Sequence, residues 1–197
     1  MAHHIRIDNK SSHPQEFEVH GWNANKNITV PAHGNSSITA PDHTSGAIIA
    51  LHQGHEGEQA EIAKDGFGNN DFIDLSNIVG AGGNLTVEQS GDRSTLKGDP
   101  VFMQDLNRAW HKADAGTKER LNRYVHTDNK GTVIRMDAIK SSPGLEEFIR
   151  SFADGKTYIG NGSWAGNPGN ANDNKQSSAA HGNKDILVTY NDGSAMP

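Results

Sequence analysis

Two carboxylates, Glu61 and Asp74, have the residue type and the placement best suited to chemistry in this sequence. Each lies in a short segment that alternates like a β-strand, residues 59–63 and residues 71–75. If the two strands are neighbours, both carboxyl groups face one cleft and form a general acid and base for glycoside hydrolysis. Such pairs are separated by about 5–5.5 Å for retention or about 6.5–9.5 Å for inversion. Sugar binding without catalysis is an alternative. So is a structural role, in which Asp74 bonds the backbone near Ser76 and Glu61 faces solvent.

Three aromatic side chains are candidates for sugar binding, because a ring face stacks well on the C–H groups of a pyranose. Trp22, Tyr158 and Trp164 all lie beside segments rich in Gly and Asn. Trp164, between small residues, is the strongest of the three, although it also suits an anchor for its own loop. We therefore predict Trp22, Tyr158 and Trp164 as substrate-binding residues.

The sequence predicts no metal site and no cofactor. Residues 126–137 resemble a calcium loop in outline, but His126 and Lys130 occupy two positions where calcium needs oxygen ligands. We interpret this segment as a helix–loop–helix without an ion. His52 and His55 have metal-like spacing in a Gly-rich turn and are interpreted as surface residues. Phosphate-loop, dinucleotide and nucleophile-elbow patterns are all missing from the sequence.

Composition narrows the range of partners. The 197 residues carry a formal net charge of −6 with no basic stripe, which argues against nucleic acid. No apolar run is long enough for membrane insertion. Cysteine is absent, so the chain has no disulfides and no thiolate chemistry. A secreted protein whose signal has been removed and a cytoplasmic protein are both compatible with these features.

The elements that must position these residues are mainly strands in the first half of the chain. Short alternating segments recur with turn residues between them, a spacing typical of a β-sandwich or barrel. They cover residues 4–8, 16–20, 27–30, 37–40, 47–51, 59–63, 71–75 and 85–88. The run at 47–51 is apolar throughout, so we expect both of its faces to be covered.

A helical pattern follows. Asp99 and Pro100 suit the start of a first helix, whose stripe comprises Phe102, Met103, Leu106 and Trp110. A second helix is predicted over residues 117–125. A third begins at Ser142 and Pro143 and buries Leu145, Phe148, Ile149 and Phe152.

Strands return at the end of the chain, at residues 156–159 and 185–190, on either side of a Gly/Asn/Ser-rich loop at 160–184. Loops of this length are commonly functional. The predicted organisation is a sandwich domain of residues 1–98 and 155–197, with a helical insert at 99–154.

The segment from Gln59 to Gly80 resembles a characteristic block of the thaumatin-like family. In that family an Ala-Glu-Phe strand is followed by a Tyr-(Ile/Tyr)-Asp-(Ile/Val)-Ser strand and a Gly turn, which residues 59–63 and 71–80 approximate. The resemblance extends over roughly residues 4–90. It implies a thaumatin-like antiparallel β-sandwich with a small helical insert, and places Glu61 and Asp74 in an acidic cleft.

The sequence departs from the family in two respects. The family is rich in disulfides, whereas this chain has no cysteine. Its cleft also holds an Arg and a further Asp, at positions that here correspond to Leu51 and Val79. Half of the implied acidic cleft is therefore missing, which weakens the expectation of glucanase or antifungal activity more than that of sugar binding.

These observations predict a carbohydrate-binding protein for a β-glucan or a similar cell-wall polysaccharide. One alternative is a glycoside hydrolase, endo-β-1,3-glucanase-like, that uses Glu61 and Asp74. Another is a non-enzymatic structural or host-interaction protein that uses the helical insert as its contact surface.

Overall fold

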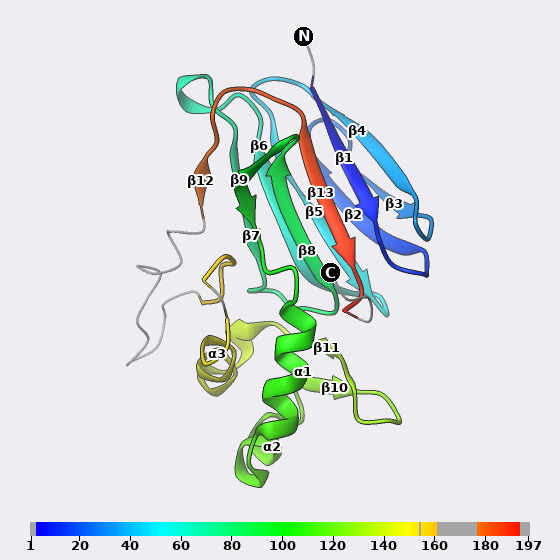
Figure 1. Cartoon of the computed structure of the whole chain (residues 1–197), viewed down its shortest axis with the longest axis vertical. Coiled ribbons are helices and arrows are strands. Elements are labelled where there is room, and N and C mark those ends of the chain that lie inside the picture. The colour runs from blue at the N-terminus through cyan, green and yellow to red at the C-terminus, as the bar shows by residue number, and fades with distance from the viewer. Residues whose placement is uncertain (1–2, 154, 161–176, 194–197) are drawn as a thin grey trace.

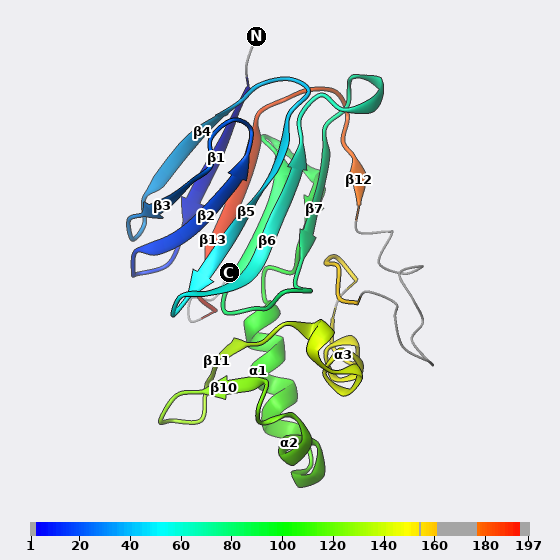
Figure 2. The same cartoon turned by 180° about the vertical axis from the view of Figure 1, so that it is seen from behind.

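A computed structural model describes residues 3–153, 155–160 and 177–193, which form two face-to-face sheets with helices at one end (Figures 1 and 2). The chain is mainly β, with a sandwich and a small helical part, as the sequence predicts. The sandwich strands are β1 (His3–Asn9), β2 (Gln15–Gly21), β3 (Lys26–Val30), β4 (Asn35–Ala40), β5 (Ser45–His52), β6 (His55–Ala63), β7 (Phe72–Ser76), β8 (Asn84–Gln89), β9 (Asp92–Lys97), β12 (Ser178–Ala179) and β13 (Ile186–Asn191).

One sheet has five strands in the order β4-β1-β13-β8-β9, and the other has six in the order β12-β7-β6-β5-β2-β3. Most neighbouring strands are antiparallel. The pair β1 and β13 is parallel, with Ile5 opposite Ile186, so the first and last sandwich strands lie side by side. The sandwich is therefore mixed at this one strand pair and not antiparallel throughout.

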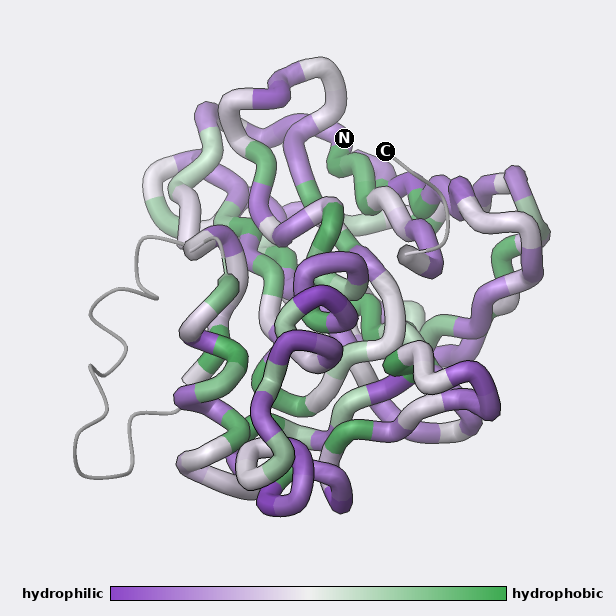
Figure 3. The backbone as a smooth tube through the Cα atoms, turned by 60° about the horizontal axis from the view of Figure 1, so that its bottom comes forward, coloured by the Kyte–Doolittle hydropathy of each residue, from purple (hydrophilic) through white to green (hydrophobic). Residues whose placement is uncertain are grey.

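Alternation along the strands builds the sandwich core. Ile5 and Ile7 of β1 are buried, as are Phe17 and Val19 of β2. Their neighbours in sequence point to the outer faces, because successive strand residues face opposite sides. Figure 3 shows this mixture of hydrophobic and hydrophilic residues along each element, with many of the outer turns hydrophilic.

The helical part has a second hydrophobic core. Its elements are α1 (Phe102–Lys112), α2 (Ala115–Leu121), β10 (Val125–Thr127), β11 (Val133–Met136), the 3-10 turn η2 (Ile139–Ser141) and α3 (Pro143–Arg150). The predicted stripe of the first helix is buried, and Trp110 packs edge-on against Phe148 at 5.9 Å between ring centroids. Ser142 caps α3 by accepting from the Leu145 N–H, and Pro143 opens the helix, which confirms the predicted start.

The first helix begins at Phe102 and not at Pro100. Asp99 accepts a hydrogen bond from the Val101 N–H at 2.9 Å, so it closes a turn before the helix instead of capping it. A capping side chain would accept from the second or third helical residue.

The prediction of a helix–loop–helix at residues 126–137 is wrong. The second helix ends at Leu121, and the segment forms an antiparallel hairpin of β10 and β11. Asp128 makes its turn by accepting from the N–H groups of Lys130 and Thr132, and Gly131 supplies a positive φ of 81°. Asp side chains commonly stabilise turns in this way.

The strand predicted at residues 156–159 is reduced to one bridge, between Tyr158 and Ser76. The long predicted loop at 160–184 contains β12, which pairs with β7, while residues 161–176 lie outside the described residues. In the described part of the chain, no helix is both long and apolar enough to cross a bilayer.

Candidate functional site

Glu61 on β6 and Asp74 on β7 lie directly opposite each other in the antiparallel register. Their sequence neighbours Ile62 and Ile73 are buried in the sandwich core. Since successive side chains alternate, both carboxyl groups point to the outer face of the six-stranded sheet, which is the nearer sheet in Figure 2. The structure thus brings together the two acids that the sequence singles out.

A shallow hollow of about 390 Å³ surrounds the pair on this face. Several of the residues that line this hollow are small. Ala47 on β5 lies beside Glu61, and a Cβ atom at Gly46 would come within 2.0 Å of the His20 carbonyl oxygen. The lining residues come from four strands and comprise His20, Ser45, Gly46, Ala47, Glu61, Ile62, Ala63, Phe72 and Asp74.

Asp74 is held protonated at neutral pH. Burial, the larger cause, and the neighbouring Glu61 together raise its pKa to about 8. One oxygen, Oδ1, is buried without a hydrogen-bond partner among the described residues, which explains the penalty on the charged form. Glu61 is exposed, so the pair consists of a neutral donor beside an open acceptor.

This geometry suits hydrogen bonding to hydroxyl groups better than glycosidic cleavage. The two carboxyl groups are close enough for Glu61 to raise the pKa of Asp74. An inverting pair leaves space of about 6.5–9.5 Å for a water molecule, and a retaining pair flanks the scissile bond at about 5–5.5 Å. Directly opposite residues of an antiparallel pair have Cβ atoms about 4.5–5.5 Å apart, which is short for the inverting arrangement.

No family model matches the chain, and no curated protein matches it. A solved structure of a laminaripentaose-producing β-1,3-glucanase in complex with laminaritetraose is similar at 12% sequence identity and a TM-score of 0.44. The match covers 77% of this chain and 56% of that one, so the chain spans just over half the length of this relative.

Trp22 does not fit the predicted sugar platform. Its side chain is 2% exposed and lies in the sandwich core, where its indole N–H donates to the Ile62 carbonyl at 3.2 Å. The glycine and asparagine around it shape a turn but leave the ring facing inward. The Gly/Asn-rich segment beside Trp22 predicts a turn of the backbone, but it does not predict which way the ring points.

Of the other two predicted aromatic residues, Tyr158 is among the residues that the structure describes. Tyr158 is half-buried and is held against β7, where its N–H donates to the Leu75 carbonyl at 2.8 Å. It therefore lies at the edge of the sheet that carries Asp74. Trp164 lies outside the described residues.

Two phenylalanines, one lining the hollow and one in the turn that joins β6 to β7, were missed from the sequence. Phe72 lines the hollow beside Asp74. Phe67, in the 3-10 turn η1 (Phe67–Asn69) that joins β6 to β7, is 89% exposed. The Gly66-Phe67-Gly68 sequence carries the same signal as Trp164, an aromatic ring between small residues, and would have identified Phe67.

His52 is not a surface residue. Its side chain is 11% exposed, and its Nε2 lies 2.7 Å from the carboxylate of Glu58, which is fully buried. His55 is exposed, as predicted. In the part of the chain that the structure describes, no three His, Asp or Glu side chains converge in a group able to hold a metal ion.

Proposed function

We propose that this chain binds a neutral cell-wall polysaccharide, of the β-glucan class or a similar one, on the outer face of its six-stranded sheet. The observation that carries the proposal is the Glu61–Asp74 pair, a protonated carboxyl beside an exposed carboxylate in an open hollow. A sugar hydroxyl both donates and accepts hydrogen bonds, so it complements both members of such a pair.

The surroundings of the pair support an extended ligand. The hollow is shallow, its lining comes from four neighbouring strands, and Phe72 offers apolar surface beside the polar pair. Polar groups placed among apolar and aromatic surface are typical of ligand sites.

Hydrolysis is a second candidate, and the raised pKa of Asp74 favours it. A carboxyl group that keeps its proton at neutral pH meets the requirement for a general acid. The close approach of Glu61 opposes it, because an inverting pair needs room for a water molecule between its carboxyl groups. A hydrolase with this pair needs the two side chains to separate when substrate enters.

We also propose that the sandwich is a thaumatin-like fold without disulfides. The support is that the resembling block forms β6, a turn and β7, with Glu61 and Asp74 opposite each other. Packed Ile, Val, Leu and Phe side chains and a buried Lys64–Asp71 ion pair stabilise the sandwich in place of disulfides.

A pull-down with insoluble β-glucan tests the binding proposal. The double variant Glu61→Ala/Asp74→Ala is expected to lose binding, while Asp74→Asn, which keeps a neutral donor, retains it. Glu119→Ala is the matched control, because it removes one exposed carboxylate in the helical part. Wild-type binding by the double alanine variant would contradict the proposal.

Release of reducing sugar in the same samples separates binding from hydrolysis. A hydrolase loses turnover in Asp74→Asn because the amide has no acidic proton, although it still binds. A binding protein shows no turnover in any of these variants.

A further inference from the structure

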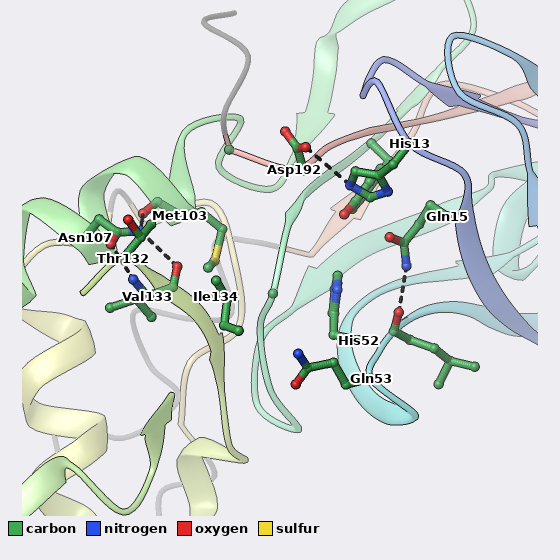
Figure 4. Close-up of a pocket in the computed structure, with 14 residues that line it drawn as sticks. His13, Gln15, His52, Gln53, Met103, Asn107, Thr132, Val133, Ile134 and Asp192 are labelled. Atoms are coloured by element: carbon green, nitrogen blue, oxygen red, sulfur yellow. Dashed lines mark hydrogen bonds and ion pairs between the residues drawn. The ribbon is translucent and has the colours of Figure 1, made fainter. Parts of the chain in front are cut away.

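A second hollow, of about 500 Å³, lies where the sandwich meets the helical part (Figure 4). It is separate from the Glu61–Asp74 hollow and shares no lining residue with it. Its walls come from the β1–β2 and β5–β6 turns, the end of β13, α1 and β11. The lining residues are His13, Gln15, Leu51, His52, Gln53, Gly82, Met103, Asn107, Thr132, Val133, Ile134, Tyr190, Asp192 and Gly193.

Tyr190 is a nearly buried residue that lines this hollow. The residue is 1% exposed, and its ring packs edge-on against Phe17 at 5.7 Å between centroids. No hydrogen bond of the hydroxyl is found within the described residues, whereas a buried tyrosine hydroxyl usually has a partner. Burial, together with the charges of Glu58 and Asp192, raises the pKa of Tyr190, so the hydroxyl stays protonated.

His52 lies beside Tyr190, with 6.3 Å between the ring centroids. The buried Glu58 carboxylate accepts at Nε2, which fixes the proton there and leaves Nδ1 as the second polar atom. Nδ1 has no hydrogen bond to any residue that the structure describes. Burial lowers the pKa of His52, but the charge and hydrogen bond of Glu58 outweigh it, so the net direction is upward.

Two consecutive glycines pack against these two rings. A Cβ atom on Gly82 would lie 2.4 Å from the His52 ring, and one on Gly83 would lie 2.3 Å from the Tyr190 ring. Any larger residue would displace the ring it faces. Gly82 and Gly83 therefore leave these two rings little room to move.

We propose that this second hollow binds a neutral polyhydroxylated molecule of mono- or disaccharide size, contacted by the Tyr190 hydroxyl and His52 Nδ1. A ligand hydroxyl can accept from the Tyr190 hydroxyl; it can donate to His52 Nδ1 when the ring is neutral and accept from it when the ring is protonated. The volume is in the range of small-molecule sites, about 300–1,000 Å³. Met103, Val133 and Ile134 supply apolar wall for the C–H groups of a sugar.

Charge argues against an anionic ligand. Glu58 is buried directly behind His52, and Asp192 lines the same hollow, where it pairs with His13 at 3.2 Å. Arg135, the nearby cation that acts on His52, is itself paired with Asp137 at 2.7 Å. The carboxylates of Glu58 and Asp192 would repel an anion but not a neutral ligand.

Calorimetric titration of the full chain with glucose, cellobiose and laminaribiose tests this proposal. We expect saturable binding of at least one of these sugars, weakened about tenfold in Tyr190→Phe by loss of one hydrogen bond. Tyr190→Phe should melt at the wild-type temperature, because the hydroxyl has no protein partner to lose. Tyr124→Phe, in the helical part, is the matched control and should bind normally.

Three outcomes would overturn the proposal: no saturable binding of any of the three sugars, equal affinity in Tyr190→Phe, or preferred binding of inorganic phosphate. Gly82→Ala, which pushes a methyl group against the His52 ring, provides a second variant and should also weaken binding. Glu61→Ala/Asp74→Ala should bind these soluble sugars as the wild type does. A failure of the sheet-face proposal is therefore distinguishable from a failure of this one.

Discussion

The Lys64 ammonium donates to the Asp71 carboxylate at 2.8 Å, and neither side chain is exposed to solvent. The carboxylate also accepts from Gln89 of β8 and from the N–H groups of Asp65 and Lys184. Asp71 thus links the β6–β7 turn to the opposite sheet and to the segment leading into β13. In a chain without disulfides, this polar cluster ties together segments that are distant in sequence.

Lys64→Met is expected to destabilise the fold by about 3–5 kcal/mol, because it leaves the Asp71 charge buried without its cation. Chemical denaturation measures the loss. Lys26→Met, at an exposed position on β3, is the control and should change stability by no more than about 0.5 kcal/mol. A small loss in Lys64→Met would mean that the cluster contributes little.

The Glu61–Asp74 pair predicts a pH-dependent stability. Asp74 has a folded-state pKa of about 8 against an ordinary 3.8, so the folded state binds a proton that the unfolded state releases across this window. The contribution is therefore fully present below about pH 4 and lost as pH rises towards about 8. Asp74→Asn should flatten this part of the stability–pH curve and be the more stable protein at alkaline pH.

Carboxyl ¹³C NMR titration of Asp74 measures the same pKa directly. In Glu61→Gln the value should fall, because the neighbouring negative charge is gone, but it should stay above the ordinary range because burial is the larger cause. An unshifted Asp74 in the wild type would contradict the paired geometry.

Trp22 is expected to matter for folding and not for binding. Trp22→Ala should lower the unfolding free energy by about 3–5 kcal/mol through loss of core packing. Trp22→Phe loses the hydrogen bond to the Ile62 carbonyl, worth about 1 kcal/mol, and some packing. Circular dichroism with denaturant measures both. If Trp22→Phe kept the wild-type stability but lost glucan binding, Trp22 would be a binding residue and this prediction would be wrong.

We expect that the β10–β11 hairpin does not bind calcium. The Asp128 carboxylate already accepts two backbone N–H groups, and Asp137 pairs with His126 and Arg135. Calcium should leave the melting temperature unchanged in scanning calorimetry. Asp128→Ala, with the turn bonds lost, should destabilise the hairpin by about 1 kcal/mol. A rise in melting temperature with calcium would overturn this interpretation.

Where the sequence failed in the helical part, the cause was a non-local contact. Leu121, Tyr124 and Val125 have helical spacing, so the second helix was predicted to continue. In the structure Met136 forms a β-bridge to Ala81, and Val125 pairs with Met136. A strand of three residues has too short a pattern to be recognised when the partner that stabilises it is distant in sequence.

The sequence by itself determined most of the sandwich strands, because alternation along a strand is a local property of the chain, but the β6–β7 pairing that sets Glu61 opposite Asp74 came from the tertiary structure. Only the tertiary structure decided the parallel β1–β13 pair, the burial of Trp22 and the second hollow around His52 and Tyr190. Burial depends on which surfaces stack against each other. Gly82 approaches the His52 ring although the two residues are distant in sequence, and the local pattern around either residue does not predict this contact.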